Sequence, residues 1–105
     1  MAGSRQGTPG SEVREQPAAE TRRPRPYKVL LHNDDYTTME FVIEVLGQIF
    51  AKSPAEAFRI MMHVHENGLG VCGAYPHEIA ETKVDQVHER ARKSGFPLRA
   101  SMEEG

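Results

Sequence analysis

The chain has 105 residues and a formal net charge of −2, with 38% hydrophobic and 27% charged residues. This length accommodates one domain with a modest core and no second one. Cys72 is the only cysteine, which excludes an internal disulfide and a cysteine-based zinc knuckle. No apolar run approaches the roughly 20 residues that cross a bilayer, and the N-terminus lacks the apolar segment of a secretory signal. We therefore expect a cytoplasmic protein without membrane contact.

Charge is divided unevenly along the chain. Residues 1–26 carry five arginines and three glutamates, a net charge of +2, and the remaining 79 residues carry eight basic and twelve acidic side chains, a net charge of −4. An acidic domain suits cationic ligands better than nucleic acid, whose phosphates require a basic surface. We expect no nucleic acid partner.

The first 26 residues differ in composition from the rest. They contain four prolines, no aromatic residue and only five apolar residues. Such a segment cannot bury enough surface to offset its ordering entropy. We predict a disordered tail over 1–26 and a folded domain over 27–105.

The folded part begins with a β-branched and aromatic run at residues 27–31, which predicts a strand closed by the turn-forming residues 33–35. Residues 37–40 have the form of a capping box in which Thr37 is the N-cap and Glu40 reaches back. Apolar residues at helical spacing predict that one face of the following helix packs on the core. These residues are Met39, Val42, Ile43, Leu46 and Phe50.

A second capping box spans residues 53–56, with Ser53 as the N-cap and Pro54 at the first helical position. The helix that it starts is expected to end at Asn67 and Gly68, which tolerate positive φ. Its predicted apolar face consists of Ala57, Ile60, Met61 and Val64.

The last third of the chain predicts a strand, a long helix and a closing strand. Residues 69–74 indicate a strand loosened by two glycines, residues from about 76 to 94 the longest helix, and residues 98–103 an alternating strand with one solvated face. The order β-α-α-β-α-β favours an α+β layer fold in which three helices cover one face of a three-stranded, mostly antiparallel sheet.

The turn Asn33-Asp34-Asp35 is the first candidate for chemistry, since it places an amide and two carboxylates between a strand and a helix. Such residues are also common in turns because their side chains bond their own backbone. The residues alone leave both interpretations open.

Two histidines and the cysteine are the other candidates. His63 and His65 are two residues apart, about 200° around a helix, so they do not easily share a metal ion, and we expect no metal site and no cofactor. His65 is either a boundary residue bonded to backbone or part of a pocket rim. Cys72 predicts a buried, inert thiol, with a Cys/His nucleophile as the alternative. No hydrolase or phosphate-loop motif is present, so we do not expect an enzyme.

Several linked motifs resemble the bacterial ClpS family over residues 27 to about 103. They read, in chain order, YKVLLHNDDYT at 27–37, MEFV at 39–42, MMHVH at 61–65, AETKV at 80–84 and PL at 97–98. Many members have proline before the methionine where this chain has Thr38, a departure with a minor expected effect on helix entry. The resemblance implies a ClpS-like fold and an N-end rule adaptor. Such an adaptor binds proteins that begin with Leu, Phe, Tyr or Trp and delivers them to the ClpA unfoldase of the ClpAP protease. We expect a monomer that cleaves nothing itself.

The resemblance also implies roles for particular residues. Asn33, Asp34 and His65 would receive the α-amino group of the client's first residue. Its side chain would enter a pocket formed by Leu31, Thr37, Met39, Val42, Met61, Val64 and Leu98. Glu78 and Lys83, on the polar side of the long helix, would face the N-terminal domain of ClpA, although charged residues there are also typical of a solvated face.

The implied amine site is chemically consistent. A free α-amine near neutral pH is a cation with three donors, and an amide oxygen, a carboxylate and a neutral imidazole nitrogen all accept hydrogen bonds. An internal residue has no such amine, and it would leave these acceptors desolvated and unpaired.

Two other functions remain as alternatives. One is a ribosome-associated or other interaction domain with the same layer fold but no amino-acid pocket. The fold is similar to the C-terminal domain of the ribosomal stalk protein, so fold alone does not decide function. The other is a metal-dependent hydrolase that uses the histidines.

Overall fold

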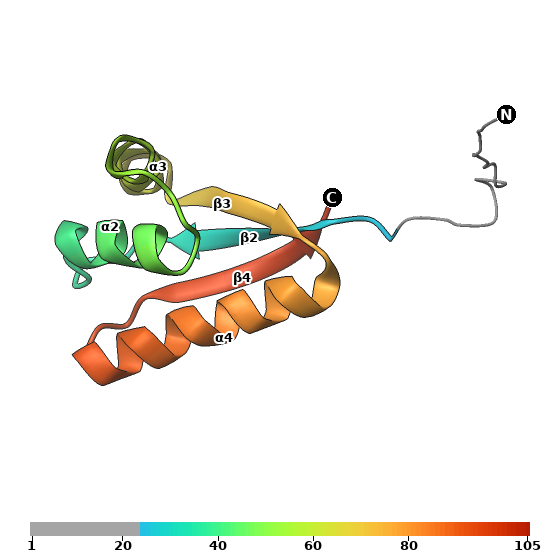
Figure 1. The fold of residues 1–105 in the computed structure, drawn as a ribbon. Helices are drawn as coiled ribbons and strands as arrows, with labels where there is room; N and C mark the ends of the chain where they lie inside the picture. The colour runs from blue at the N-terminus through green and yellow to red at the C-terminus, as the bar shows by residue number, and fades with distance from the viewer. Residues whose placement is uncertain (1–23) are drawn as a thin grey trace, which may run out of the picture.

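The computed structural model describes residues 24–105, which form a three-stranded antiparallel sheet and three helices (Figure 1). Along the chain the elements are β2 (Tyr27–His32), α2 (Met39–Gln48), α3 (Pro54–Asn67), β3 (Leu69–Tyr75), α4 (His77–Ser94) and β4 (Arg99–Glu104). The predicted α+β class and the order β-α-α-β-α-β are confirmed. The predicted disordered tail spans residues 1–26, and residues 1–23 of it lie outside the described residues. None of the described helices is long and apolar enough to cross a membrane.

β2 is the central strand of the sheet. It pairs antiparallel with β3 on one side and with β4 on the other. Val29 pairs with Gly73 and Leu30 with Val71, so Cys72 is an extra residue in β3 and forms a bulge. Figure 1 shows α4 running along the sheet, while α2 and α3 lie near the end of β2. The loop that follows β2 leads directly into α2.

The core lies between the sheet and the helices. Val29 and Leu31 of β2 are both 0% exposed and pack in one cluster with buried residues of all three helices. Alternation along a strand explains why these two residues share a face. The cluster also holds Val45 and Leu46 of α2 and Val87 of α4.

Helix α2 differs from its prediction at both ends. Its N-cap is Thr38 rather than Thr37, and the Thr38 hydroxyl accepts a hydrogen bond from the Phe41 amide at 3.1 Å. The helix ends at Gln48 instead of continuing to Phe50. Its buried face consists of Phe41, Val42, Val45 and Leu46. The predicted apolar face is therefore wrong for Met39, which is 45% exposed.

Helix α3 agrees closely with its prediction. Ser53 is the N-cap, with its hydroxyl accepting from the Glu56 amide at 3.2 Å, and Pro54 occupies the first turn. Gly68 caps the other end with φ of 91°, a conformation that glycine adopts without strain. The four residues predicted to face the core are the four that are buried, namely Ala57, Ile60, Met61 and Val64.

Candidate functional site

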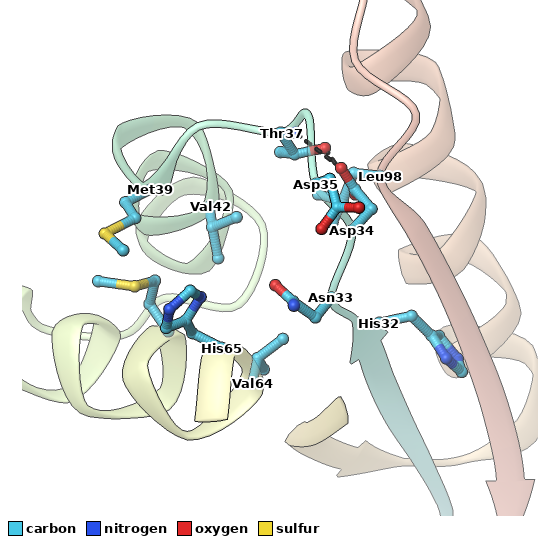
Figure 2. A pocket seen from close by; sticks show the side chains of 11 residues that line it. His32, Asn33, Asp34, Asp35, Thr37, Met39, Val42, Val64, His65 and Leu98 are labelled. Carbon is cyan, nitrogen blue, oxygen red and sulfur yellow. Dashed lines mark hydrogen bonds between the residues drawn. The ribbon is translucent and has the colours of Figure 1, made fainter. Parts of the chain in front are cut away.

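A cavity of about 220 Å³ lies where the end of β2 meets α2 and α3 (Figure 2). It is smaller than the roughly 300–1,000 Å³ of typical small-molecule sites, and it suits one side chain. The residues that line it are His32, Asn33, Asp34, Asp35, Thr37, Met39, Val42, Met61, Val64, His65 and Leu98.

The cavity brings together nine of the ten residues that were expected to form the amine site and the side-chain pocket. Leu31 is the exception, because it is 0% exposed within the core cluster and does not line the cavity. Its position in β2 explains the difference, since Leu31 shares the core face of this strand with Val29.

A backbone hydrogen bond fixes the polar end of the cavity. The Asn33 amide donates to the carbonyl oxygen of Gly68 at 2.8 Å. Gly68 is the C-cap of α3, and His65 lies in the last turn of the same helix. This bond therefore holds Asn33 at a set place relative to His65. Figure 2 shows the two side chains reaching into the same space from different elements.

Asp34 organises the loop between β2 and α2. Its Oδ1 accepts hydrogen bonds from the amides of Tyr36 and Thr37 at 2.8 and 2.7 Å, and its Oδ2 accepts one from the Thr37 hydroxyl at 2.8 Å. Partial burial acts to raise the pKa of Asp34, but the hydrogen bonds from Thr37 and Tyr36 outweigh it and lower the pKa. Thr37 donates its hydroxyl to Asp34, which leaves the capping of α2 to Thr38.

Asp35 lines the cavity and belongs to the candidate turn 33–35, but the family resemblance gave it no role. It is exposed, and within residues 24–105 its carboxylate takes part in no hydrogen bond or ion pair. Of the two neighbouring carboxylates, Asp34 bonds the backbone two and three residues ahead, the pattern of an Asx turn. The sequence contained a clue to this role. An Asx turn requires only one carboxylate, so two adjacent aspartates predict that the second one is available to a ligand.

His65 lies at the rim of the cavity. It is exposed and lines the cavity, which supports the pocket-rim alternative over that of a boundary residue bonded to backbone. Within the described chain its ring bonds no other residue, so both of its nitrogens are accessible to a ligand. His63, by contrast, pairs with the Asn67 side chain at 3.2 Å and does not line the cavity.

The other walls of the cavity are apolar. Val42, Met61, Val64 and Leu98 are all at most 8% exposed. Val64 is held in place by the close approach of β3, since a Cβ on Gly70 would lie 2.9 Å from the Val64 Cγ2. Met39 differs from these four, because it lines the cavity and is also 45% exposed. It therefore forms part of the cavity mouth.

The metal and nucleophile alternatives find no support among residues 24–105. No group of three or more His, Cys, Asp or Glu side chains in this range could hold a metal ion. Cys72 is buried, as predicted, and burial raises its pKa to about 12. Its thiol is therefore protonated at neutral pH, and a thiolate is the form that acts as a nucleophile.

The two residues expected at the unfoldase surface lie in different settings on α4. Glu78 is exposed in the first turn of the helix. Lys83 is half-buried, and its ammonium donates a hydrogen bond to the carbonyl oxygen of Ile49 at 2.7 Å. The expectation that both residues lie on a solvated face is correct for Glu78 and wrong for Lys83.

Comparison with known proteins identifies the family. Residues 22–101 match the family model described as ATP-dependent Clp protease adaptor protein ClpS. This chain belongs to the ClpS family. The ClpS adapter of Nitratidesulfovibrio vulgaris (strain Miyazaki F) is 60% identical over 85 residues, which cover 81% of this chain and 85% of that protein. The adapter of Maricaulis maris is 55% identical over 101 residues, covering 96% of this chain and 90% of its own length.

A solved ClpS structure has the same fold. The structure of Agrobacterium tumefaciens ClpS2 bound to L-phenylalaninamide is similar with a TM-score of 0.77 and 41% sequence identity. The match covers 79% of this chain and all of the solved chain. The ClpS relatives are named as adaptors of a protease.

Proposed function

We propose that this ClpS protein binds client polypeptides by an N-terminal Leu, Phe, Tyr or Trp and delivers them to the ClpA unfoldase of the ClpAP protease. The observation that carries the proposal is a cavity of about 220 Å³ with hydrogen-bond acceptors at one end and buried apolar walls. It matches the first residue of a polypeptide, which combines a charged amine with a side chain.

The polar end supplies acceptors for the α-amine. An ammonium that leaves water needs several of them. Within residues 24–105, no hydrogen bond occupies the Asn33 amide oxygen, the Asp35 carboxylate or the ring nitrogens of His65, so these groups can accept from the amine. Asp34, expected to contact the amine, contributes mainly by holding the loop through Tyr36 and Thr37. The amine site that we propose is therefore Asn33, Asp35 and His65, supported by Asp34.

The apolar walls select the side chain. Full burial of a Leu or Phe side chain contributes about 1.5–3 kcal/mol, whereas a charged side chain there would find no partner. The walls are Thr37, Val42, Met61, Val64 and Leu98, with Met39 at the mouth. The relative bound to L-phenylalaninamide supports this assignment, because that ligand has a free α-amine and a blocked carboxyl group, like the first residue of a chain.

A peptide titration tests the proposal. Fluorescence anisotropy would compare a Leu-initiated peptide with its Met-initiated twin and with its N-acetylated form. We expect binding of the first peptide only, and loss of that binding in Asn33→Ala at an unchanged melting temperature. Equal binding of the acetylated peptide would contradict the proposal, because acetylation removes the charge that the acceptors require.

Delivery would depend on the outer parts of the protein. We propose that the adaptor acts as a cytoplasmic monomer, that Glu78 contacts the N-terminal domain of ClpA, and that residues 1–26 serve as a handle for the unfoldase. A variant that begins at Pro24 is expected to bind peptides normally and to fail in promoting ClpAP degradation of a Leu-initiated client. Full degradation with that variant would exclude a role for the tail.

A further inference from the structure

The outer face of α3 carries two apolar side chains that are not fully buried. Phe58 is 54% exposed, and Met62 is partly buried and packs against the core cluster. The two residues line a shallow hollow of about 360 Å³ together with Arg59, His63 and Glu66. Contiguous exposed apolar patches rimmed by polar residues often mark interaction sites, and methionine adapts its shape to varied apolar partners.

This face continues from the rim of the cavity. With 3.6 residues per turn, His65, Met62 and Phe58 fall within about 60° of one another around α3. They form a strip, defined here as the α3 strip, that begins at the rim and runs towards the N-terminal end of the helix. Met39 flanks the same side of the mouth, and Figure 2 shows it across the cavity from Asn33 and Asp35.

The size of the cavity limits how much of a client it can hold. It has room for one side chain, so the second and later residues of a bound client must lie outside it. A bound client therefore leaves the cavity through its mouth, which the exposed residues Met39 and His65 border. The strip begins at that exit. Its continuity with the cavity favours the client chain over a separate partner as its occupant.

The spacing of the strip fits an extended chain. Side chains on one face of an extended segment recur every two residues, about 6.6 Å apart. Phe58 and Met62 are four residues apart on a helix, about 6 Å along its axis. If the first client side chain enters the cavity beside His65, the third and fifth point to the same surface and lie near Met62 and Phe58.

We propose that the α3 strip is an extension of the client site, in which Met62 contacts the third residue of the client and Phe58 contacts the fifth. The strip favours apolar or aromatic side chains at these two positions. This inference rests on the proposed function, since it requires the client's first residue to occupy the cavity.

The test uses three Leu-initiated peptides of equal length and composition. One carries Phe at positions 3 and 5, one carries Phe at positions 2 and 4, and one carries both Phe residues beyond position 8. We expect the first peptide to bind roughly three- to tenfold more tightly than the other two. Phe58→Ser should remove this advantage, and Phe58→Leu should restore part of it.

Matched controls distinguish the strip from the cavity. Ile79→Ser changes a similarly exposed residue, 47% accessible, on α4, and it should leave the ranking of the three peptides unchanged. N-acetylated versions of the peptides test the proposed function itself. If acetylation has no effect, the proposed function fails; if acetylation abolishes binding but all three peptides bind alike, only the α3 strip assignment fails.

One further measurement separates the client from a partner protein. Calorimetry with the isolated N-terminal domain of ClpA should give the same affinity for Phe58→Ser as for the unchanged protein. A weaker complex with that domain, together with unchanged peptide affinities, would assign the strip to the unfoldase and overturn the proposal.

Discussion

The ammonium of Lys83 donates a 2.7 Å hydrogen bond to the carbonyl oxygen of Ile49, the residue that caps α2 at its C-terminal end. A cation is favourable at this end of a helix, where carbonyl groups lack intrahelical partners. The Lys83 nitrogen also lies 5.4 Å from the ring centre of Tyr75. Lys83 thus ties α4 to α2, the helix whose first turn carries Met39.

Lys83→Met should therefore lower the free energy of unfolding. The methionine keeps most of the apolar stem and removes the charged donor, and we expect a loss of about 1–2 kcal/mol. Urea denaturation of both proteins measures this difference in the free energy of unfolding. Glu78→Ala is the control on the same helix, and it should change stability by less than about 0.5 kcal/mol because Glu78 is exposed. Equal stability of Lys83→Met and the unchanged protein would show that the bond to Ile49 contributes nothing.

The two α4 variants also separate docking from stability. If the unfoldase contacts Glu78, calorimetry with the N-terminal domain of ClpA should show weaker binding for Glu78→Ala at full stability. Any loss in Lys83→Met has to be compared with its loss of stability before Lys83 is assigned to the interface.

Asp34 and Asp35 should respond differently to substitution. Asp35→Ala is expected to weaken binding of a Leu-initiated peptide at least tenfold and to leave the melting temperature unchanged, because its carboxylate holds no other part of the described chain. Asp34→Ala removes the acceptor of three hydrogen bonds from Tyr36 and Thr37. It should lower both the melting temperature and the peptide affinity. If Asp34→Ala instead lost only peptide affinity and Asp35→Ala lost stability, Asp34 would be the residue that contacts the amine.

The pKa of Asp34 predicts how its contribution varies with pH. Partial burial acts to raise this pKa, but the hydrogen bonds from Thr37 and Tyr36 lower it below the ordinary value of 3.8. The stabilisation by ionised Asp34 is thus fully present above that value and is lost as pH falls through the lower folded-state pKa. The stability difference between the unchanged protein and Asp34→Ala should be constant above about pH 5 and shrink below 3.8.

Thr37→Val is the control for this titration. This substitution removes the hydroxyl donor and keeps the two backbone donors to Asp34. The stability that Thr37→Val loses on acidification should therefore be smaller than the pH-dependent contribution of Asp34 measured with Asp34→Ala. If the stability difference between the unchanged protein and Asp34→Ala instead grew on acidification, the pKa of Asp34 would not be lowered by folding.

Local signals in the sequence predicted most of the fold. Ser53 and Gly68 bound α3 as their cap chemistry predicts, and the four predicted core residues of that helix are buried. The start of α2 was ambiguous, because Thr37 and Thr38 can both cap a helix. The hydrogen bond from Thr37 to Asp34 decides between them, and that bond depends on the shape of the loop.

Distant contacts were beyond the sequence patterns. The helical spacing that placed Lys83 on a solvated face contains no sign of Ile49, which is 34 residues away in the chain. The residues lining the cavity come from separate segments of the chain. Their common site was therefore predicted from the family motifs and not from periodicity. Periodicity describes one helix or strand at a time. It places Leu31 beside Val29 on the core face of β2, but it cannot show that Leu98, which lies between α4 and β4, lines the cavity.

Met39 provides the sharpest test of client selection. Its side chain follows the Thr38 cap and stands at the cavity mouth, 45% exposed. Leu, Phe, Tyr and Trp have an unbranched Cβ, whereas Ile and Val carry an extra carbon there, next to the client backbone that a rim residue would contact in the proposed site. We therefore expect Met39 to exclude β-branched residues by steric overlap.

Met39→Ala should relieve this overlap and admit Ile- and Val-initiated peptides, with a gain of about 1–2 kcal/mol. Leu-initiated peptides should change less, because in the proposed site their branch point would lie deeper, towards the wall that Val42, Val64 and Leu98 form. The measurement is a panel of peptides that differ only in the first residue, titrated against both proteins, with N-acetylated peptides as the control for amine-dependent binding. A parallel loss of affinity for every peptide would mean that Met39 supports the cavity wall without selecting among clients.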